Sequence, residues 1–119
     1  MHRFKDLKVW QKGRFLVKDI YLITKNFPAE ELYGMTSQIR RSAVSIPANI
    51  AEGCGRNTNP DLNRFLDISN GSAFELETLM ILSSDLDFIT DEEFLKIDSQ
   101  IQEIQKMIYS FKQTLTNKK

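Results

Sequence analysis

The sequence predicts an all-α protein: an antiparallel, up-and-down four-helix bundle that forms a single domain over residues 1–119. Apolar side chains recur at spacings of three and four residues along most of the chain, which is the period of one helix face. No stretch alternates between apolar and polar residues as a half-buried strand would. Five glycines and three prolines are few for 119 residues, and a chain of this length fits one domain.

The first predicted helix spans residues 6–26. Asp6 is expected to cap its N-terminus, and Phe27-Pro28 is expected to end it because the residue before a proline disfavours the helical conformation. Its apolar residues form one broad face that should point into the core. These residues are Val9, Trp10, Leu16, Val17, Ile20, Tyr21 and Ile23.

The second predicted helix spans residues 35–53 and ends at Gly53-Cys54-Gly55. Pro47 lies inside it, where the ring removes one backbone hydrogen bond and clashes with the carbonyl of Ala43, so we expect a kink at this position. The core stripe of this helix consists of Met35, Ile39, Ala43, Ile46 and Ile50.

The third predicted helix spans residues 60–87. Asn59 is expected to cap it, because Pro60 follows at the first helical position, where proline is favoured. Small residues in the middle of its apolar stripe should allow a neighbouring helix to approach closely. The stripe consists of Leu62, Phe65, Leu66, Ser69, Ser72, Ala73, Leu76, Leu79, Met80, Ser83 and Leu86.

The fourth predicted helix spans residues 91–116, and Thr90 with Glu93 forms a capping box at its start. Its apolar residues repeat at heptad spacing, which is typical of left-handed helix packing. They are Phe94, Ile97, Ile101, Ile104, Ile108, Phe111 and Leu115. Because the connections are short, sequential helices should be antiparallel neighbours.

The residue inventory predicts a protein without catalytic, metal or cofactor chemistry. His2 is the only histidine and Cys54 the only cysteine, so neither a zinc ligand set nor a carboxylate–histidine di-metal site can be assembled. Ser-His and Cys-His nucleophile pairs are excluded for the same reason. We therefore expect a protein that is not an enzyme.

The chain is also expected to be cytoplasmic. Its N-terminus lacks the apolar stretch of a secretion signal. No run approaches the roughly 20 apolar residues that a membrane span needs.

Charge is unevenly distributed along a chain that is neutral overall. Residues 1–56 contain ten basic and five acidic side chains, whereas residues 57–119 contain six basic and eleven acidic ones. This asymmetry favours contact between the two halves, within one chain or between chains. Chance segregation of charges over solvated faces is the alternative.

Two pairs of apolar residues lie outside the core faces of the first and third predicted helices. Basic side chains flank the pair on the first helix, and acidic side chains flank the pair on the third. Such matched ridges predict a contact between different faces of two subunits, which closes into a ring; local burial by irregular packing is the alternative. The candidate interface residues are Phe15, Leu22, Lys12, Lys18, Phe74, Ile81, Asp67 and Asp85.

A polar stripe on the second helix, continued into the following loop, is the candidate nucleic-acid surface. Arginine side chains and amide donors can bind a phosphate backbone. A solvated face without a ligand is the alternative. The candidate residues are Gln38, Arg40, Arg41, Asn49 and Arg56.

Residues 38–53, which read QIRRSAVSIPANIAEG, resemble the signature of the bacterial 23S ribosomal-RNA intervening-sequence proteins. Three further segments match: Leu7-Lys8-Val9-Trp10, Phe27-Pro28 with Tyr33-Gly34, and Gly71-Ser72 followed by Glu75-Leu76-Glu77-Thr78. The resemblance implies a four-helix bundle that assembles as a homopentameric ring without catalytic residues. The family is related to the accessory proteins of diversity-generating retroelements, which are basic pentameric barrels that engage a reverse transcriptase and nucleic acid. This chain differs from them in having no net charge.

Two functional hypotheses remain open. The first is an oligomer that binds RNA or DNA weakly through the arginines of the second helix. The second is a homo-oligomeric scaffold that presents a surface to a partner protein, for example a reverse transcriptase, without binding nucleic acid.

Overall fold

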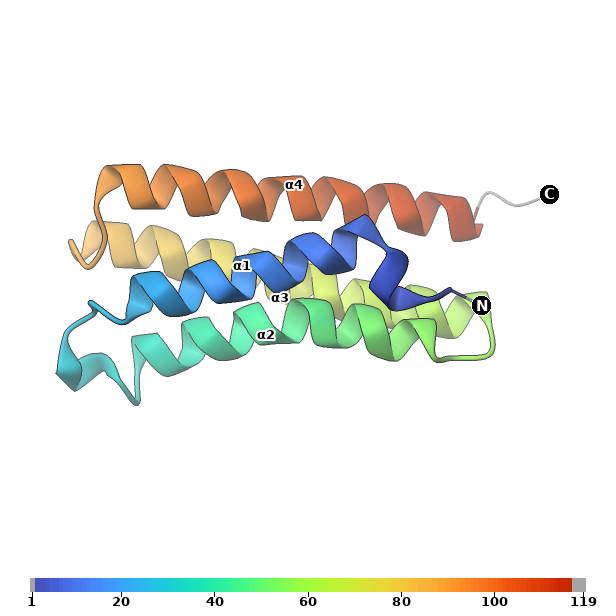
Figure 1. The fold of residues 1–119 in the computed structure, drawn as a ribbon, viewed down its shortest axis with the longest axis horizontal. Helices are drawn as coiled ribbons and strands as arrows, with labels where there is room; N and C mark the ends of the chain where they lie inside the picture. The colour runs from blue at the N-terminus through green and yellow to red at the C-terminus, as the bar shows by residue number, and fades with distance from the viewer. Residues whose placement is uncertain (1, 117–119) are drawn as a thin grey trace.

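The computed structural model describes residues 2–116 and shows four long helices packed side by side in a body of 50 × 23 × 20 Å (Figure 1). No strand occurs in this part of the chain, so the predicted all-α bundle is confirmed. The helices are α1 (Lys8–Thr24), α2 (Met35–Cys54), α3 (Asn59–Asp85) and α4 (Asp91–Thr116). Two short 3-10 helices, η1 (Phe4–Asp6) and η2 (Ala29–Glu31), precede α1 and α2.

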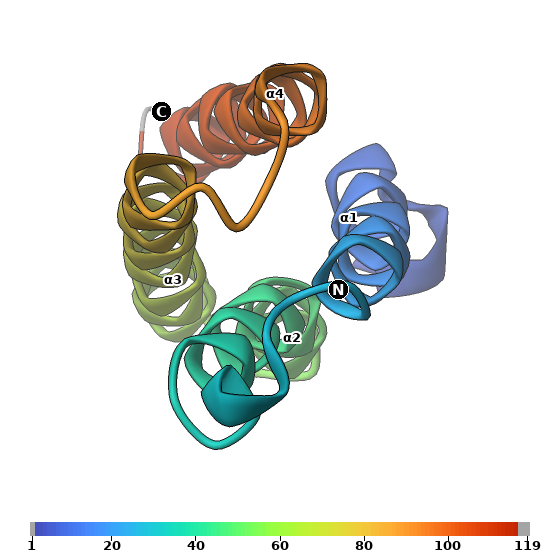
Figure 2. The same ribbon diagram turned by 90° about the vertical axis from the view of Figure 1, so that its left-hand side faces the viewer.

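The four helices occupy the corners of a square when the bundle is viewed along its axis (Figure 2). Both α2 and α4 pack against α1 and against α3, whereas α1 and α3 lie at opposite corners. Successive helices are antiparallel, so α1 and α3 run in the same direction. The basic half of the sequence therefore forms one side of the bundle, α1 with α2, and the acidic half forms the other.

Isoleucine and leucine dominate the core between the four helices. The largest fully buried side chains are Leu16, Ile20, Ile39, Ile46, Ile50, Leu66, Leu76, Met80, Ile97, Ile101, Ile104 and Ile108. Two residues expected in the core are instead exposed, namely Tyr21 and Leu86. Leu86 is the residue after the last helical position of α3, so it no longer follows the apolar stripe of that helix.

The helix starts agree with the sequence predictions at α4 and differ at α1 and α3. Thr90 and Glu93 form the predicted capping box through hydrogen bonds of 3.0 and 3.1 Å. Asp6 does not cap α1, because it lies in η1 and α1 begins two residues later. At α3 the cap is Thr58 and not Asn59: the Thr58 hydroxyl accepts from the Asp61 amide at 3.2 Å.

Pro47 lies at a point where α2 contacts both of its neighbours. α2 continues as one helix through this residue, so the expected kink does not divide it. A Cβ atom at Gly13 of α1 would lie 3.4 Å from the Cβ of Pro47, an ordinary contact, so α1 packs directly against the proline ring at this residue. On the other side, the Ser69 hydroxyl of α3 donates to the Ile46 carbonyl at 2.9 Å.

Gly53 marks a second close approach, between the C-terminal end of α2 and the start of α3. A Cβ atom here would lie 2.8 Å from Cδ1 of Leu62 and 2.9 Å from Cβ of Phe65. The Leu62 methyl could rotate away, but the Phe65 Cβ moves only with its backbone. The glycine is therefore required by the spacing of α2 and α3.

We predict that Gly53→Ala lowers the free energy of unfolding by about 1–3 kcal/mol, the usual cost of overpacking a close contact. Urea unfolding followed by circular dichroism measures the change. Gly55→Ala is the matched control: a Cβ atom there would lie 3.5 Å from the Glu52 carbonyl oxygen, an ordinary contact. Equal stability of the two variants would contradict this account of the α2–α3 spacing.

Candidate binding surfaces

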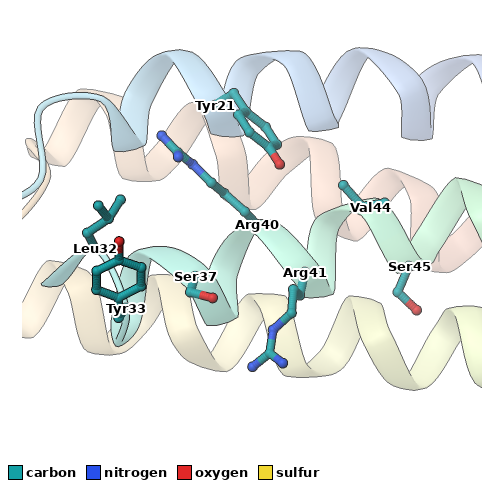
Figure 3. Close-up of a pocket in the computed structure, with 8 residues that line it drawn as sticks. All are labelled: Tyr21, Leu32, Tyr33, Ser37, Arg40, Arg41, Val44 and Ser45. Atoms are coloured by element: carbon teal, nitrogen blue, oxygen red, sulfur yellow. The ribbon is translucent and has the colours of Figure 1, made fainter.

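A groove of about 560 Å³ follows the outer face of α2 near its N-terminal end (Figure 3). The end of α1 and the segment before α2 form its other walls. Its lining residues are Tyr21, Leu32, Tyr33, Ser37, Arg40, Arg41, Val44 and Ser45. Tyr33 is 93% exposed, so the groove combines unshielded aromatic and aliphatic surface with two arginines. The two arginines point in different directions, Arg40 toward α1 and Arg41 away from it.

Arg40 connects α2 to α1 and does not extend into solvent as the nucleic-acid hypothesis requires. Its Nε donates to the Thr24 hydroxyl at 2.9 Å, and its guanidinium carbon lies 4.5 Å from the centre of the Tyr21 ring. The Thr24 hydroxyl in turn donates to the Ile20 carbonyl at 2.7 Å. The sequence analysis did not predict this contact of Arg40 with α1, because a projection of α2 alone does not show which of its sides faces α1.

Arg56 is also engaged within the chain. Its guanidinium lies 2.9 Å from the Glu52 carboxylate and 4.6 Å from the centre of the Phe65 ring. An exposed ion pair of this kind contributes little to stability, but it neutralises the charge that a phosphate would need. Arg56 is therefore a weaker candidate than its sequence position indicates.

Asn49 belongs to the seam between α2 and α3. Its side-chain amide donates to the carbonyl and to the hydroxyl of Ser45, at 2.9 Å each. The Ser45 hydroxyl is 2.7 Å from that of Ser72 on α3. Of the five predicted nucleic-acid contacts, Gln38, Arg41 and Arg56 are exposed. Unlike Arg56, Arg41 has no ion pair within residues 2–116.

The apolar ridges of α1 and α3 are exposed in the single chain. Phe15 and Leu22 of α1 are 58% and 50% exposed, and Phe74 and Ile81 of α3 are 54% and 44% exposed. Irregular packing within one chain therefore does not bury them. Their role as a subunit contact stays a prediction.

Two of the four charges expected to flank these ridges are paired within the chain. Lys12 lies 3.3 Å from Glu103 of α4, and Asp67 forms an ion pair with Lys112 of α4. These contacts are possible because both charged residues lie on the sides of α1 and α3 that face α4, which a single-helix projection does not reveal. Lys18 and Asp85 have no ion pair among the described residues.

The structure adds exposed apolar residues on α3 that the sequence reasoning missed. Ile68 and Leu82 are each 42% exposed, and Leu86 is 55% exposed. Together with Phe74 and Ile81 they extend the exposed apolar surface of α3, and of the residue that follows it, beyond a single ridge and between charged side chains such as Asp67 and Glu75. Counting apolar residues around the whole helix, rather than along one stripe, could have identified this surface.

Metal-ligating side chains are dispersed over the part of the chain that the structure describes. Residues 2–116 contain no cluster of three or more His, Cys, Asp or Glu side chains that could hold a metal ion. Cys54 is buried, and burial raises the pKa of its thiol, so the reactive thiolate is disfavoured. Within the same residues no helix has the length and hydropathy required to cross a membrane.

The geometry defines a small helical-bundle protein with exposed apolar ridges and one arginine–tyrosine groove. The chain belongs to the 23S rRNA-intervening sequence protein family, whose model matches residues 5–110. It is similar to a crystal structure from Bacteroides thetaiotaomicron described as a protein of unknown function from the S23 ribosomal protein family, with 30% sequence identity and a TM-score of 0.79. The similarity covers 87% of this chain and 97% of that one. A comparison with curated proteins finds no match.

We predict that Arg40→Ala lowers the free energy of unfolding by about 1–2 kcal/mol, because it removes one side-chain hydrogen bond and one cation–π contact. Arg41→Ala, which deletes the same side chain one residue away, should leave stability unchanged within about 0.5 kcal/mol. Thermal or urea unfolding of both variants gives the comparison. A larger loss of stability for Arg41→Ala than for Arg40→Ala would contradict the conclusion that Arg40 is the arginine that links α2 to α1.

Proposed function

We propose that the protein is a non-catalytic, self-assembling scaffold of the cytoplasm: a cyclic homo-oligomer in which α1 of one subunit contacts α3 of the next. The observation that carries this proposal is the exposure of the ridge Phe15 and Leu22 on α1 and the ridge Phe74 and Ile81 on α3. Burying each large apolar side chain contributes roughly 1.5–3 kcal/mol before association costs are subtracted. These four side chains are already about half buried in the single chain, so the rest of the α1–α3 contact must supply the remainder that offsets the cost of association.

The position of the two ridges supports a ring and not a two-fold dimer. Because α1 and α3 lie at opposite corners of the bundle, each subunit can contact two neighbours through two different surfaces. Contacts between unlike surfaces generate rings when the rotation closes. The basic α1–α2 side would then meet the acidic α3–α4 side of the neighbour, which opposes pairing of like sides. The pentamer implied by the family resemblance is the ring size that we propose.

Such a ring leaves the outer faces of α2 and α4 uncovered, so that the groove of α2 is repeated once per subunit. Repetition raises the avidity for any partner that can contact several grooves together. A partner protein that presents an apolar surface with carboxylates would fit the tyrosines and Arg41 of the groove.

We predict that Phe15→Asp and Phe74→Asp each produce smaller assemblies than the wild type, because each places a charge in an apolar contact. Lys18→Glu should weaken assembly less, since charge pairs at the solvated edge of an interface contribute little. Sedimentation velocity at micromolar concentration measures the mass, and circular dichroism verifies the helical content.

Leu95→Asp is the control for these variants. Leu95 is 65% exposed on α4, away from both ridges, so its replacement should leave the assembly intact. A wild-type protein that is monomeric at these concentrations would overturn the proposed function. If only Leu95→Asp reduced the mass, the interface would lie on α4 instead.

Weak binding of RNA or DNA is the second candidate function. The observation that favours it is the exposed Arg41, which lines the same groove as Tyr33 and has no ion pair among the described residues. Arginine can contact a phosphate, and an exposed aromatic ring can stack on an unpaired base. One arginine per subunit gives a low intrinsic affinity, which a ring would increase through avidity.

For this candidate we predict that a labelled single-stranded RNA of mixed sequence binds weakly at 50 mM salt and loses most of its affinity at 200 mM. Arg41→Glu should abolish the binding without changing the fold. Lys106→Glu, an equal charge change at an exposed position of α4, should reduce it much less. Fluorescence anisotropy gives the affinities, and equal losses for both variants would exclude the groove as the site.

A further inference from the structure

Gly71 is an exposed glycine in the middle of α3 for which the single chain offers no packing reason. A Cβ atom at this position would have no neighbouring atom within 4 Å. Glycine inside a helix destabilises it by about 1 kcal/mol relative to alanine. The other two glycines inside long helices, Gly13 and Gly53, each face atoms of a neighbouring helix within 3.4 Å.

The four helix-surface neighbours of Gly71 are two apolar residues, Ile68 and Phe74, and two acidic residues, Asp67 and Glu75. Ile68 and Phe74, one helical turn before and after it, are 42% and 54% exposed. Residues three apart on a helix are surface neighbours, so these two side chains stand on either side of the missing one. In helix packing, a hole of this kind receives a single large side chain from the facing helix.

We propose that Gly71 forms the floor of a hole that receives Phe15 from α1 of a second copy of this chain. The inference rests on the proposed self-assembly and identifies the residue pair at its centre. Because Gly71 has no side chain, Phe15 can pack directly over the backbone of α3. Any other residue at position 71 would hold the two helices further apart.

The heights of the two residues along the bundle support this pairing. The turn of α2 at Ile46 and Pro47 contacts Gly13 of α1 on one side and Ser69 of α3 on the other. Gly13 and Ser69 therefore lie at similar heights. Because α1 and α3 run in the same direction, Phe15 and Gly71, each two residues further on, lie at similar heights as well.

Rotation about an axis parallel to the bundle preserves these heights from one subunit to the next. A ring with such an axis therefore brings Phe15 of one copy to the level of Gly71 in its neighbour. A ring with a strongly tilted axis would not do so.

The charges next to the two residues identify α1 of a second copy, rather than α3, as the occupant. Lys18 follows Phe15 by one helical turn, and Glu75 follows Gly71 by one turn in the same direction. Neither has an ion pair within residues 2–116. In the proposed contact Lys18 and Glu75 lie side by side. Two copies of α3 that meet at Gly71 would instead place Glu75 beside another carboxylate, that of Glu75 in a parallel contact or of Asp67 in an antiparallel one.

The test uses substitutions at Gly71 whose effects on folding and on assembly have opposite signs. Gly71→Ala should make the isolated fold more stable, because alanine favours the helix and its Cβ meets open space. The same change should weaken assembly, because the Cβ raises the floor of the hole. Gly71→Leu should raise the concentration of half-assembly at least about tenfold, as overpacking at a close contact requires. Sedimentation velocity over a dilution series measures this concentration, and urea unfolding of the dissociated protein measures stability.

Ser110→Leu is the matched control, since it adds a leucine at an exposed position of α4 and should leave assembly unchanged. The occupant is tested by combining Gly71→Leu with Phe15→Ala. The smaller side chain should restore part of the assembly that Gly71→Leu removes, so that the two changes are not additive.

The outcomes separate this inference from the proposed function. A monomeric wild type would overturn both. A wild type that assembles, with a half-assembly concentration unaffected by Gly71→Leu, would overturn the inference and leave the scaffold intact. Weakening by Gly71→Leu without any recovery in the double variant would also overturn it, because another surface would then occupy the hole.

Discussion

The close contact of α2 with both of its neighbours is the constraint on which the rest of the structure depends. Gly13 of α1 packs directly against the ring of Pro47, and glycine at position 53 admits the start of α3. Hydrogen bonds from Ser69 to Ile46 and between Ser45 and Ser72 add polar links in the α2–α3 seam. These contacts fix the spacing and relative height of α1, α2 and α3, and therefore fix which side chains remain outside.

The contacts between neighbouring helices also determine which charged residues have partners within the chain. Arg40 lies between α1 and α2, where its guanidinium stacks on the Tyr21 ring and its Nε donates a hydrogen bond to the Thr24 hydroxyl. Lys12 of α1 and Asp67 of α3 each form an ion pair with a residue of α4. Among the residues that the structure describes, Lys18 and Arg41 are exposed cations without an ion pair on the basic side of the bundle. The predicted nucleic-acid surface on α2 is therefore smaller than its polar stripe indicates.

Helix α3 exposes more apolar surface than a solvated helix needs. Its inner face fills the core, yet Ile68, Phe74, Ile81, Leu82 and Leu86 remain exposed outside it. Exposed apolar residues that cluster along one element mark interaction surfaces more often than scattered ones do. An assembly would cover this surface without any change in the bundle, which supports the proposed scaffold over a protein that acts through its arginines alone.

The sequence was sufficient to predict the four helices, the capping box at Thr90 and the inner stripes, because helical periodicity and local capping are short-range properties of the chain. The motif of residues 38–53 was sufficient to predict the family. The sequence also placed Phe15 and Phe74 outside the core. The tertiary structure was needed to show which polar residues are engaged in packing, since Arg40 and Ser45 meet partners on other helices that a projection of one helix does not contain. The exposure of Leu86 and the open space at Gly71 were likewise decided by where the helix ends and what its neighbours leave uncovered.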